Sequence, residues 1–540
     1  MAGGAVVTGD GIGANAPKNK FAGIVMVCFA AFAGILFGYD TGVISGVKEM
    51  DNWLSIFGEP NPDFGVKPDA GPYSISSSRE SLIVSILSAG TFFGALLGAP
   101  LGDFLGRKGG VIVGCLVFAV GVAMQTAAMH VPLFVVGRVF AGLGVGIVSC
   151  LIPMYQSECS PKWIRGAVVS LYQWAITIGL LLAAIVNNST QNRAGRSSWR
   201  IPTAVQFAWA AILGGGMLIL PESPRWYIKR GKYDEAAKAL ARLTGLSADD
   251  AETQAEINDV RASLEAERAM GESSYVDCFR SGHNKILLRT LTGIFIQAWQ
   301  QLTGINFIFY YGTTFFKNSG ISNPFVITII TNVVNVVMTL PGIWGVERFG
   351  RRSLLLWGAV LMCVCEYIVA IVGVTVSVNN IAGQKVLIAF VCIYIAGFAS
   401  TWGPIAWVIT GEIFPLQVRA KAMSLSVASN WLWNFAIGYA TPYLVNKEAG
   451  SAGLEAKVFF IWGTTCLCCV IFTLICVPET KGLSLEQIDL MYQHTNPWRA
   501  GAYRAQLIAE DIHVADAVGK GAGSTMHHQE DHASDVEKGI

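Results

Sequence analysis

The chain has 540 residues, of which 53% are hydrophobic and only 14% are charged, with a formal net charge of +1 and a mean hydropathy of +0.49. Soluble domains carry about 25% charged residues, so this composition indicates a membrane protein. It also excludes nucleic-acid binding, which requires a concentrated basic surface that this sequence lacks.

The first twenty residues lack the charged start, short apolar core and cleavage site of a removable signal, and the apolar run from Phe21 is long enough to remain as a span. The twelve cysteines fall mostly inside apolar runs. They predict small core residues and no disulfide framework.

Apolar runs near the length that crosses a bilayer recur along the chain. They predict twelve membrane spans, six on each side of a polar stretch, near residues 21–46, 82–101, 111–129, 133–154, 166–187, 201–220, 286–316, 323–345, 354–376, 386–411, 422–445 and 456–477. The predicted fold class is therefore an all-α membrane protein. Its expected regions are an N-terminal tail, a six-helix bundle, a linker, a second six-helix bundle and a C-terminal helix with a disordered tail, over residues 1–20, 21–220, 221–285, 286–477 and 478–540.

Helical spacing of Tyr233, Leu240 and Leu243 predicts short helices within the polar linker. The residues after about 500 are polar and predict disorder.

Five glycines recur at intervals of four in the second predicted span: Gly90, Gly94, Gly98, Gly102 and Gly106. This spacing makes a smooth stripe against which another helix packs closely.

Three motifs occur twice in the same order. The charged turn of Gly98–Gly114 recurs 244 positions later, the Glu158, Pro161, Arg165 set recurs 254 later, and Pro221-Glu222-Ser223 recurs 257 later as Pro478-Glu479-Thr480. These matches predict a duplicated unit of roughly 250 residues.

Basic residues gather in alternate connections between the spans, namely Arg107, Lys108, Lys162, Arg165, Arg348, Arg351, Arg352, Arg419 and Lys421. The positive-inside rule predicts that this side, with both termini, is cytoplasmic. The 188–200 loop would then be external, and Asn187 and Asn188 begin two overlapping glycosylation triplets there.

Asp40 lies inside the first predicted span, where a carboxylate is costly unless it is paired or protonated. Arg138, near the start of the fourth span, is its expected partner. Two interpretations remain open at this point: an ion pair that fixes helix packing, or a proton site that binds a proton when the pair separates.

Amide side chains form a second polar set within apolar sequence. Amides offer donors and acceptors without charge, which suits a ligand covered in hydroxyl groups. The set is Gln173, Gln300, Gln301, Asn306, Asn335, Asn430 and Asn434, and Trp407 and Trp431 add flat apolar faces. Gly304 and Gly403-Pro404 predict local helix breaks, and broken helices in mid-membrane form substrate sites in transporters.

Taken together, these motifs resemble the sugar porters of the major facilitator superfamily, and fungal monosaccharide transporters in particular. The resemblance runs from about 21 to 495 and rests on Gly38-Tyr39-Asp40, Gly137-Arg138, Pro153-Met154-Tyr155, Pro221-Glu222-Ser223-Pro224-Arg225, the run from Gln300 to Asn306, Glu347-Arg348 with Gly350-Arg351-Arg352, and Pro478-Glu479-Thr480-Lys481-Gly482.

The resemblance implies alternating access, in which two six-helix bundles rock about a central sugar site in the plasma membrane. It implies sugar contacts at Gln173, Gln300, Gln301, Asn306, Asn335, Trp407 and Asn430, and an outer gate at Tyr310 and Tyr311. It further implies a cytoplasmic clasp formed by Glu158, Arg165, Glu412 and Arg419 with Asp103, Arg107, Glu347 and Arg351. Asp40 matches the acidic residue of proton-coupled members.

Three functions are compared. The first is a monosaccharide transporter, by proton symport or by facilitated diffusion, and the second is a glucose sensor built on the same fold. The third is a membrane enzyme, which is disfavoured because the sequence has no nucleophile elbow, metal-ligand spacing or phosphate loop. We expect a monomer in the bilayer that binds a monosaccharide and a proton, with no metal and no cofactor.

Overall fold

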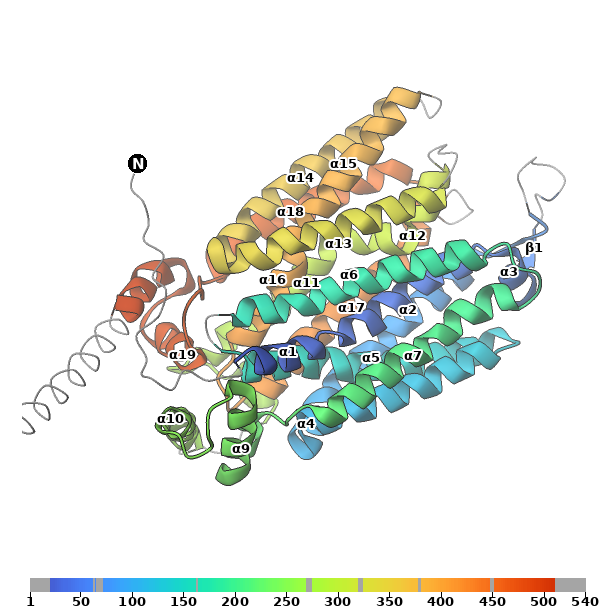
Figure 1. The fold of residues 1–540 in the computed structure, drawn as a ribbon. Coiled ribbons are helices and arrows are strands. Elements are labelled where there is room, and N and C mark those ends of the chain that lie inside the picture. Colours follow the sequence, from blue (N-terminus) through green and yellow to red (C-terminus); the bar gives the residue numbers. More distant parts are fainter. Residues whose placement is uncertain are drawn as a thin grey trace, which may run out of the picture.

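The computed structural model describes residues 20–61, 64, 71–161, 164–268, 274–318, 324–376, 380–446 and 451–509. Long helices run side by side through an elongated body, and α9, α10 and α19 gather at one end of it (Figure 1). We call that end the charged end, and the end that carries α3 and β1 the opposite end.

The first half consists of long helices with one short hairpin at the opposite end. Strands β1 and β2 pair antiparallel, with Glu59 opposite Ser74. The elements are α1 (Lys20–Ala30), α2 (Ala33–Val47), α3 (Asp51–Phe57), β1 (Glu59–Pro60), β2 (Tyr73–Ser74), α4 (Ser77–Ala127), α5 (Val131–Cys159), α6 (Arg165–Thr190) and α7 (Ser197–Ile219).

Short helices connect the halves: α8 (Pro224–Lys229), α9 (Tyr233–Thr244), α10 (Ala251–Arg268) and the 3-10 turn η1 (Val276–Phe279). The second half then contains α11 (Ile286–Leu302), α12 (Ile305–Asn318), α13 (Pro324–Arg348), α14 (Arg351–Thr375), α15 (Ile381–Ser400), α16 (Trp402–Glu412), α17 (Arg419–Val445), η2 (Glu455–Lys457) and α18 (Val458–Cys476). It is followed by α19 (Leu485–His494) and η3 (Pro497–Arg499).

Nine helical segments among the described residues are long and apolar enough to cross a membrane. One of them, α4, contains two predicted spans, because Gly106 leaves helical geometry with φ 86° and the chain reverses there. The seventh predicted span is divided into α11 and α12 at Gly304, whose φ is 81°. The eleventh is α17, which has 27 residues but a more polar sequence. The predicted fold class of twelve spans in two bundles is confirmed.

The glycine stripe of α4 packs against α5 within the first half. A Cβ atom built on Gly94 would lie 2.2 Å from the backbone oxygen of Leu143, and one on Gly146 would lie 2.2 Å from that of Thr91. The two backbones therefore touch without intervening side chains, as the spacing predicts.

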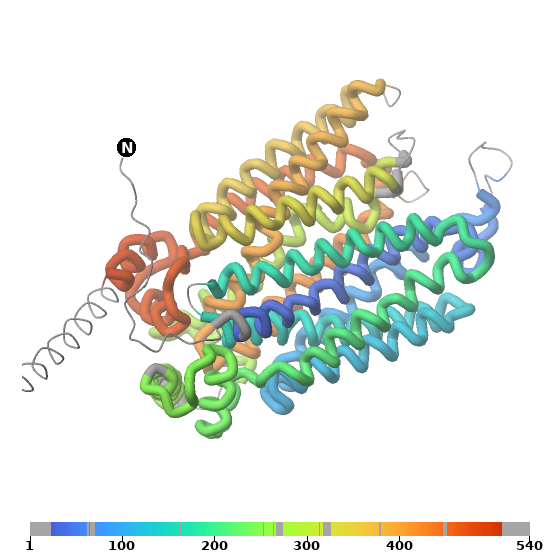
Figure 2. The backbone as a smooth tube through the Cα atoms, viewed as in Figure 1, coloured from blue at the N-terminus to red at the C-terminus, as the bar shows by residue number. Residues whose placement is uncertain are grey.

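The expectation of disorder after about residue 500 is wrong for its first ten residues. Residues 500–509 are helical and bury Leu507. Arg504 Nε donates to the Lys481 carbonyl at 2.6 Å, and the Tyr503 ring stacks on His494 with centroids 5.5 Å apart. Figure 2 shows this C-terminal segment, in red, at the charged end with the green linker helices. The remainder of the tail lies outside the described residues.

Candidate functional site

A cavity between the two halves contains about 440 Å³ of empty space, which includes space open to solvent. We call it the central cavity. The first half lines it with α2 and α6, through Phe37, Thr41, Gln173, Ile176 and Leu180. The second half contributes Gln300, Gln301, Ile305, Asn306, Phe309, Phe398, Trp407, Asn430 and Asn434.

The break at Gly304 positions the amides of this cavity. Gln300 and Gln301 lie in the last turn of α11, and Asn306 lies in the first turn of α12, on the other side of the break. A Cβ on Gly304 would lie 2.5 Å from the Trp462 ring, so both the positive φ and the close packing require glycine there. The break thus turns these three polar side chains toward one volume.

Hydrogen bonds link these amides to one another. Asn430 Nδ2 donates to Gln300 Oε1 at 2.8 Å, and Asn434 Nδ2 donates to Gln301 Oε1 at 3.1 Å. Asn306 also donates to Gln301 Oε1. Across the cavity, Trp407 Nε1 donates to Gln173 Oε1 at 3.2 Å, which joins the second half to the first.

Six of the seven residues that the resemblance assigns to sugar contact line the central cavity. The exception is Asn335 of α13, which is fully buried outside the lining and has no hydrogen-bond partner for either amide atom among the described residues. Conversely, Asn434 was not assigned to the site, yet it lines the cavity. The signal for Asn434 is the same one that identifies the other amides of the cavity, namely an amide side chain in an otherwise apolar span.

Asp40 and Arg138 lie together in the first half, where both are almost completely buried. Asp40 Oδ2 is 3.8 Å from Arg138 Nη2, which is an ion-pair distance too long for a hydrogen bond. Both carboxyl oxygens lack a hydrogen-bond partner among the described residues. The structure therefore brings the predicted partners together but leaves the carboxylate incompletely satisfied.

Tyr310 and Tyr311 of α12 bond to α17 within the second half, and Tyr311 also meets the first half at Lys48. The Tyr310 hydroxyl donates to Asn434 Oδ1 at 2.9 Å, and the Tyr311 hydroxyl donates to the Gly438 carbonyl at 2.6 Å. Lys48, after α2 in the first half, forms an ion pair with Glu80 and places Nζ 4.3 Å from the centroid of the Tyr311 ring. A cation above an aromatic ring is attracted by its negative face.

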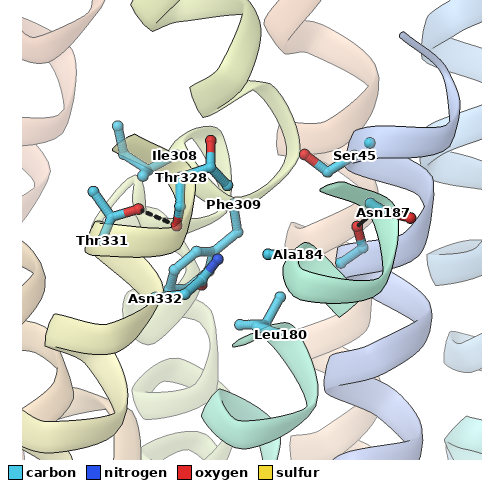
Figure 3. Close-up of a pocket in the computed structure, with 11 residues that line it drawn as sticks. Ser45, Leu180, Ala184, Asn187, Ile308, Phe309, Thr328, Thr331 and Asn332 are labelled. Carbon is cyan, nitrogen blue, oxygen red and sulfur yellow. Dashed lines mark hydrogen bonds between the residues drawn. The ribbon is translucent and has the colours of Figure 1, made fainter. Parts of the chain in front are cut away.

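A second cavity, of about 450 Å³, lies between the central cavity and the opposite end. Its polar side chains include Ser45, Thr331 and Asn332, and Figure 3 shows Phe309 reaching from α12 towards Leu180 and Ala184 of α6. Leu180 and Phe309 line both cavities and therefore form the partition between them.

The two glycosylation candidates lie in different environments at the end of α6. Asn187 is buried, and its Nδ2, the atom that would carry a glycan, donates to the Gly42 carbonyl at 3.0 Å. This geometry contradicts modification of Asn187, because the nitrogen is engaged inside the protein. Asn188 is exposed and stays a candidate.

At the charged end, the first half closes a network of its own. Arg107 donates from Nε and Nη2 to the two oxygens of Glu158, at 3.0 and 2.9 Å. Asp103 lies 3.6 Å from Arg107 and 2.9 Å from Lys229. The Glu222 carboxylate accepts from the backbone nitrogen of Arg107 at 3.0 Å, directly after Gly106.

The second half repeats this network with the duplicated residues. Arg351 donates to Glu412 at 2.9 Å and to Glu347 at 3.1 Å. The Glu479 carboxylate accepts from the backbone nitrogen of Arg351 at 3.0 Å, after Gly350 with φ 89°.

The pairing of the clasp residues therefore differs from the expected clasp between the bundles. The ion pairs among the described clasp residues lie within each half and not between the halves. Arg165 and Arg419 form no such pair among the described residues; Arg419 Nε donates instead to the Phe414 carbonyl at 3.0 Å. Glu347 does cross between the halves, because it accepts from the Ala167 backbone nitrogen at 3.2 Å.

A further bond at this end joins the linker to the C-terminal helix. Arg225 of α8 donates to Glu486 of α19 at 2.6 Å. Burial alone would raise the pKa of Glu486, but the Arg225 guanidinium lowers it to about 2. The sequence had not identified this pair, although Arg225 belongs to a quoted motif.

Residues 26–492 match the family model described as sugar (and other) transporter. The major facilitator-type transporter ecdD of Aspergillus rugulosus is 50% identical over 485 residues, covering 88% of this chain and 88% of its own. The probable glucose transporter rco-3 of Neurospora crassa is 45% identical and covers 89% of this chain and 81% of its own. The high glucose sensor RGT2 of Saccharomyces cerevisiae is 40% identical over 88% of this chain, which spans 61% of the sensor.

Among solved structures, the proton:xylose symporter XylE bound to 6-bromo-6-deoxy-D-glucose superposes with a TM-score of 0.75 at 28% identity, covering 87% of this chain and 99% of XylE. These relatives are transporters and, in one case, a glucose sensor, and none of them is an enzyme. This chain belongs to the sugar transporter family of the major facilitator superfamily.

Proposed function

We propose that the protein moves glucose-like monosaccharides, with xylose among them, across the plasma membrane by alternating access and together with a proton. The observation that carries this proposal is the amide-lined central cavity between the halves. Contacts join the halves on both sides of that cavity, at Lys48 and Tyr311 and at Ala167 and Glu347.

The chemistry of the lining fits a pyranose ring. Gln173, Gln301 and Asn306 offer donors and acceptors in several directions, and sugar hydroxyls both donate and accept. Trp407 presents an apolar ring to the carbon–hydrogen face of a sugar. An entering sugar would exchange its hydroxyls for the amide–amide bonds, so the amides remain satisfied before and after binding.

The Asp40 and Arg138 pair supports proton coupling. At 3.8 Å the positive guanidinium stabilises the Asp40 carboxylate. A movement that separated α2 from α5 would leave that carboxylate unpaired in a buried site, where the neutral, protonated form is favoured. Binding of sugar and binding of a proton would then be linked through the position of the same helices.

We place the charged end in the cytoplasm, because the basic residues of both repeated turns lie there. The protein would act as a monomer in the bilayer.

Two alternatives have support of their own. Facilitated diffusion requires the same cavity but no proton, and the sensor relative shows that a similar sequence can belong to a glucose sensor. The match covers 61% of that sensor's length.

Uptake of labelled glucose and xylose by cells without their own hexose transporters tests the proposal. We expect accumulation above the external concentration that collapses when a proton uncoupler is added. Absence of uptake despite surface expression would contradict transport. Uptake that equilibrates without accumulation and is unaffected by the uncoupler would establish facilitated diffusion.

A further inference from the structure

Glu366 is a carboxyl group for which the transport proposal has no use. It lies on α14 in the second half and is fully buried. Among the described residues, neither carboxyl oxygen has a hydrogen-bond partner, and no cation forms an ion pair with it. An ionised carboxylate without a partner in a membrane span is costly, so this geometry accommodates Glu366 only as the neutral acid.

The titratable groups that face Glu366 are all uncharged. They are the Tyr394 hydroxyl from α15, the Cys466 thiol from α18, and Cys363 and Cys365 from its own helix. No described basic group interacts with it from these or the other helices that pack on α14. The state of Glu366 is therefore not fixed by a permanent countercharge.

Tyr394 connects this carboxyl to the helix break. Its hydroxyl donates to the Thr303 carbonyl at 2.6 Å, and Thr303 is the last residue before Gly304. Thr303 Oγ1 in turn donates to the Gln300 carbonyl at 2.7 Å. Hydrogen-bonded groups thus extend from Tyr394, beside Glu366, to Gln300 in the central cavity.

We propose that Glu366 is a second proton-binding site of this transporter, which controls sugar affinity through Tyr394. A tyrosine hydroxyl has one proton to donate. While Glu366 is protonated, the Tyr394 hydroxyl donates its hydrogen bond to the Thr303 carbonyl, which is the bond present in this structure. When the carboxyl O–H bond breaks, the proton passes to solvent water and the electron pair stays on the carboxylate, which is the stronger acceptor.

The Tyr394 hydroxyl then donates its hydrogen bond to the Glu366 carboxylate, and the Thr303 carbonyl loses its donor. The break between α11 and α12 is no longer fixed at that point, so Gln300, Gln301 and Asn306 lose their common orientation. Sugar affinity falls as a result. This inference rests on the proposed function, because it assigns a control to the same sugar site.

Glucose binding to the purified full-length protein, measured between about pH 5 and about pH 9, tests the inference. The measurement is made in the Asp40→Asn background, which removes the other proton site. We expect affinity to fall by about 10-fold as the pH rises, which is the effect of losing one buried hydrogen bond. Adding Glu366→Gln, which keeps a neutral side chain of the same shape, should hold affinity at its low-pH value.

Adding Tyr394→Phe instead should make affinity independent of pH at the weaker value. This variant decides the matter if Glu366→Gln is not recovered as folded protein. Affinity that does not change with pH in the Asp40→Asn background, or a pH dependence that persists in Tyr394→Phe, would overturn the inference alone. Absence of glucose binding by folded wild type at every pH would overturn the proposed function as well.

Discussion

Gln301 is the residue at which the amide network of the central cavity converges. Its Oε1 atom accepts from Asn306 and Asn434, while its Nε2 atom donates to Gln300. A single side chain therefore orients amides from both parts of the broken helix and from α17. Its replacement should disturb the site more than it disturbs the fold, because every group involved faces the cavity.

Gln301→Ala and Asn306→Ala should each weaken glucose affinity by about 10-fold or more, since each removes a buried amide that we propose bonds to the sugar. Glucose binding to the purified variants, with thermal unfolding to establish that they fold, measures this effect. Asn335→Ala is the matched comparison, because Asn335 lies outside the lining. An unchanged affinity in both cavity variants would place the sugar elsewhere.

Asp40→Asn should abolish accumulation of sugar against a gradient while exchange of labelled for unlabelled sugar continues. The amide has the same shape as the carboxyl group but cannot release or bind a proton. Uptake and exchange in vesicles, with and without an imposed pH gradient, separate the two activities. Accumulation that survives in Asp40→Asn would remove Asp40 from the coupling mechanism.

At the scale of elements, α12 connects the central cavity to the predicted gate. It follows the Gly304 break, contributes Asn306 to the central cavity, and carries Tyr311, whose ring lies beside Lys48 of the first half. Binding and gating are thus combined on one short helix. Any contact that holds Tyr311 also biases the position of Asn306.

Lys48→Met should open the opposite end, because it keeps an apolar stem but removes the cation above Tyr311. A thiol introduced by Thr331→Cys, in the second cavity, should then react about 5-fold faster with a hydrophilic reagent, the factor that corresponds to one cation–π contact. Lys48→Arg keeps the charge and should react like wild type. Equal rates in all three proteins would show that Lys48 does not hold the gate.

The contact of α8 with α19 should depend on pH in a defined direction. Because the pKa of Glu486 is lowered to about 2 in the folded protein, its pair with Arg225 stabilises fully above the ordinary glutamate pKa of about 4.3. That stabilisation is lost as the pH falls from there towards 2. The Glu486 side chain is 33% exposed, so solvent screening makes the contribution modest.

Arg225→Gln should therefore lower the melting temperature by a few degrees near neutral pH and less at about pH 3. Thermal unfolding of the detergent-solubilised protein measures the shift. Arg261→Gln is the control, because its pair with Glu265 on α10 is more exposed, at 49% and 57%. A shift of the same size in both variants would mean that charge, and not this contact, is responsible.

At the scale of the whole molecule, the duplication accounts for what the sequence predicts well. Apolar length identifies the spans, and repeated motifs identify the two charged turns, because both patterns depend on local residues alone. The amide set was also predictable, since a polar side chain in an apolar run is conspicuous. Six of its members meet in one cavity because the Gly304 break and the meeting of the halves bring them together.

Partner choice was harder to predict, because the same charges can pair within a half or across halves. Arg107 pairs with Glu158 inside the first half, and that choice depends on how α4 and α5 pack, which the sequence alone does not give. Residues 500–509 were missed because a polar, Gly-containing segment resembles a tail until its few apolar side chains find a surface. Asn187 was misassigned because a glycosylation triplet carries no information about burial.

The internal ion pairs of the two charged turns have a kinetic consequence. The charged hydrogen bonds from Arg107 to Glu158 and from Arg351 to Glu412 each close within one half. The bond from the Ala167 nitrogen to Glu347 joins one half to the other. A movement of one half against the other can therefore leave the two internal bonds intact, so that each charged turn would travel with its own bundle and would not need to re-form during turnover.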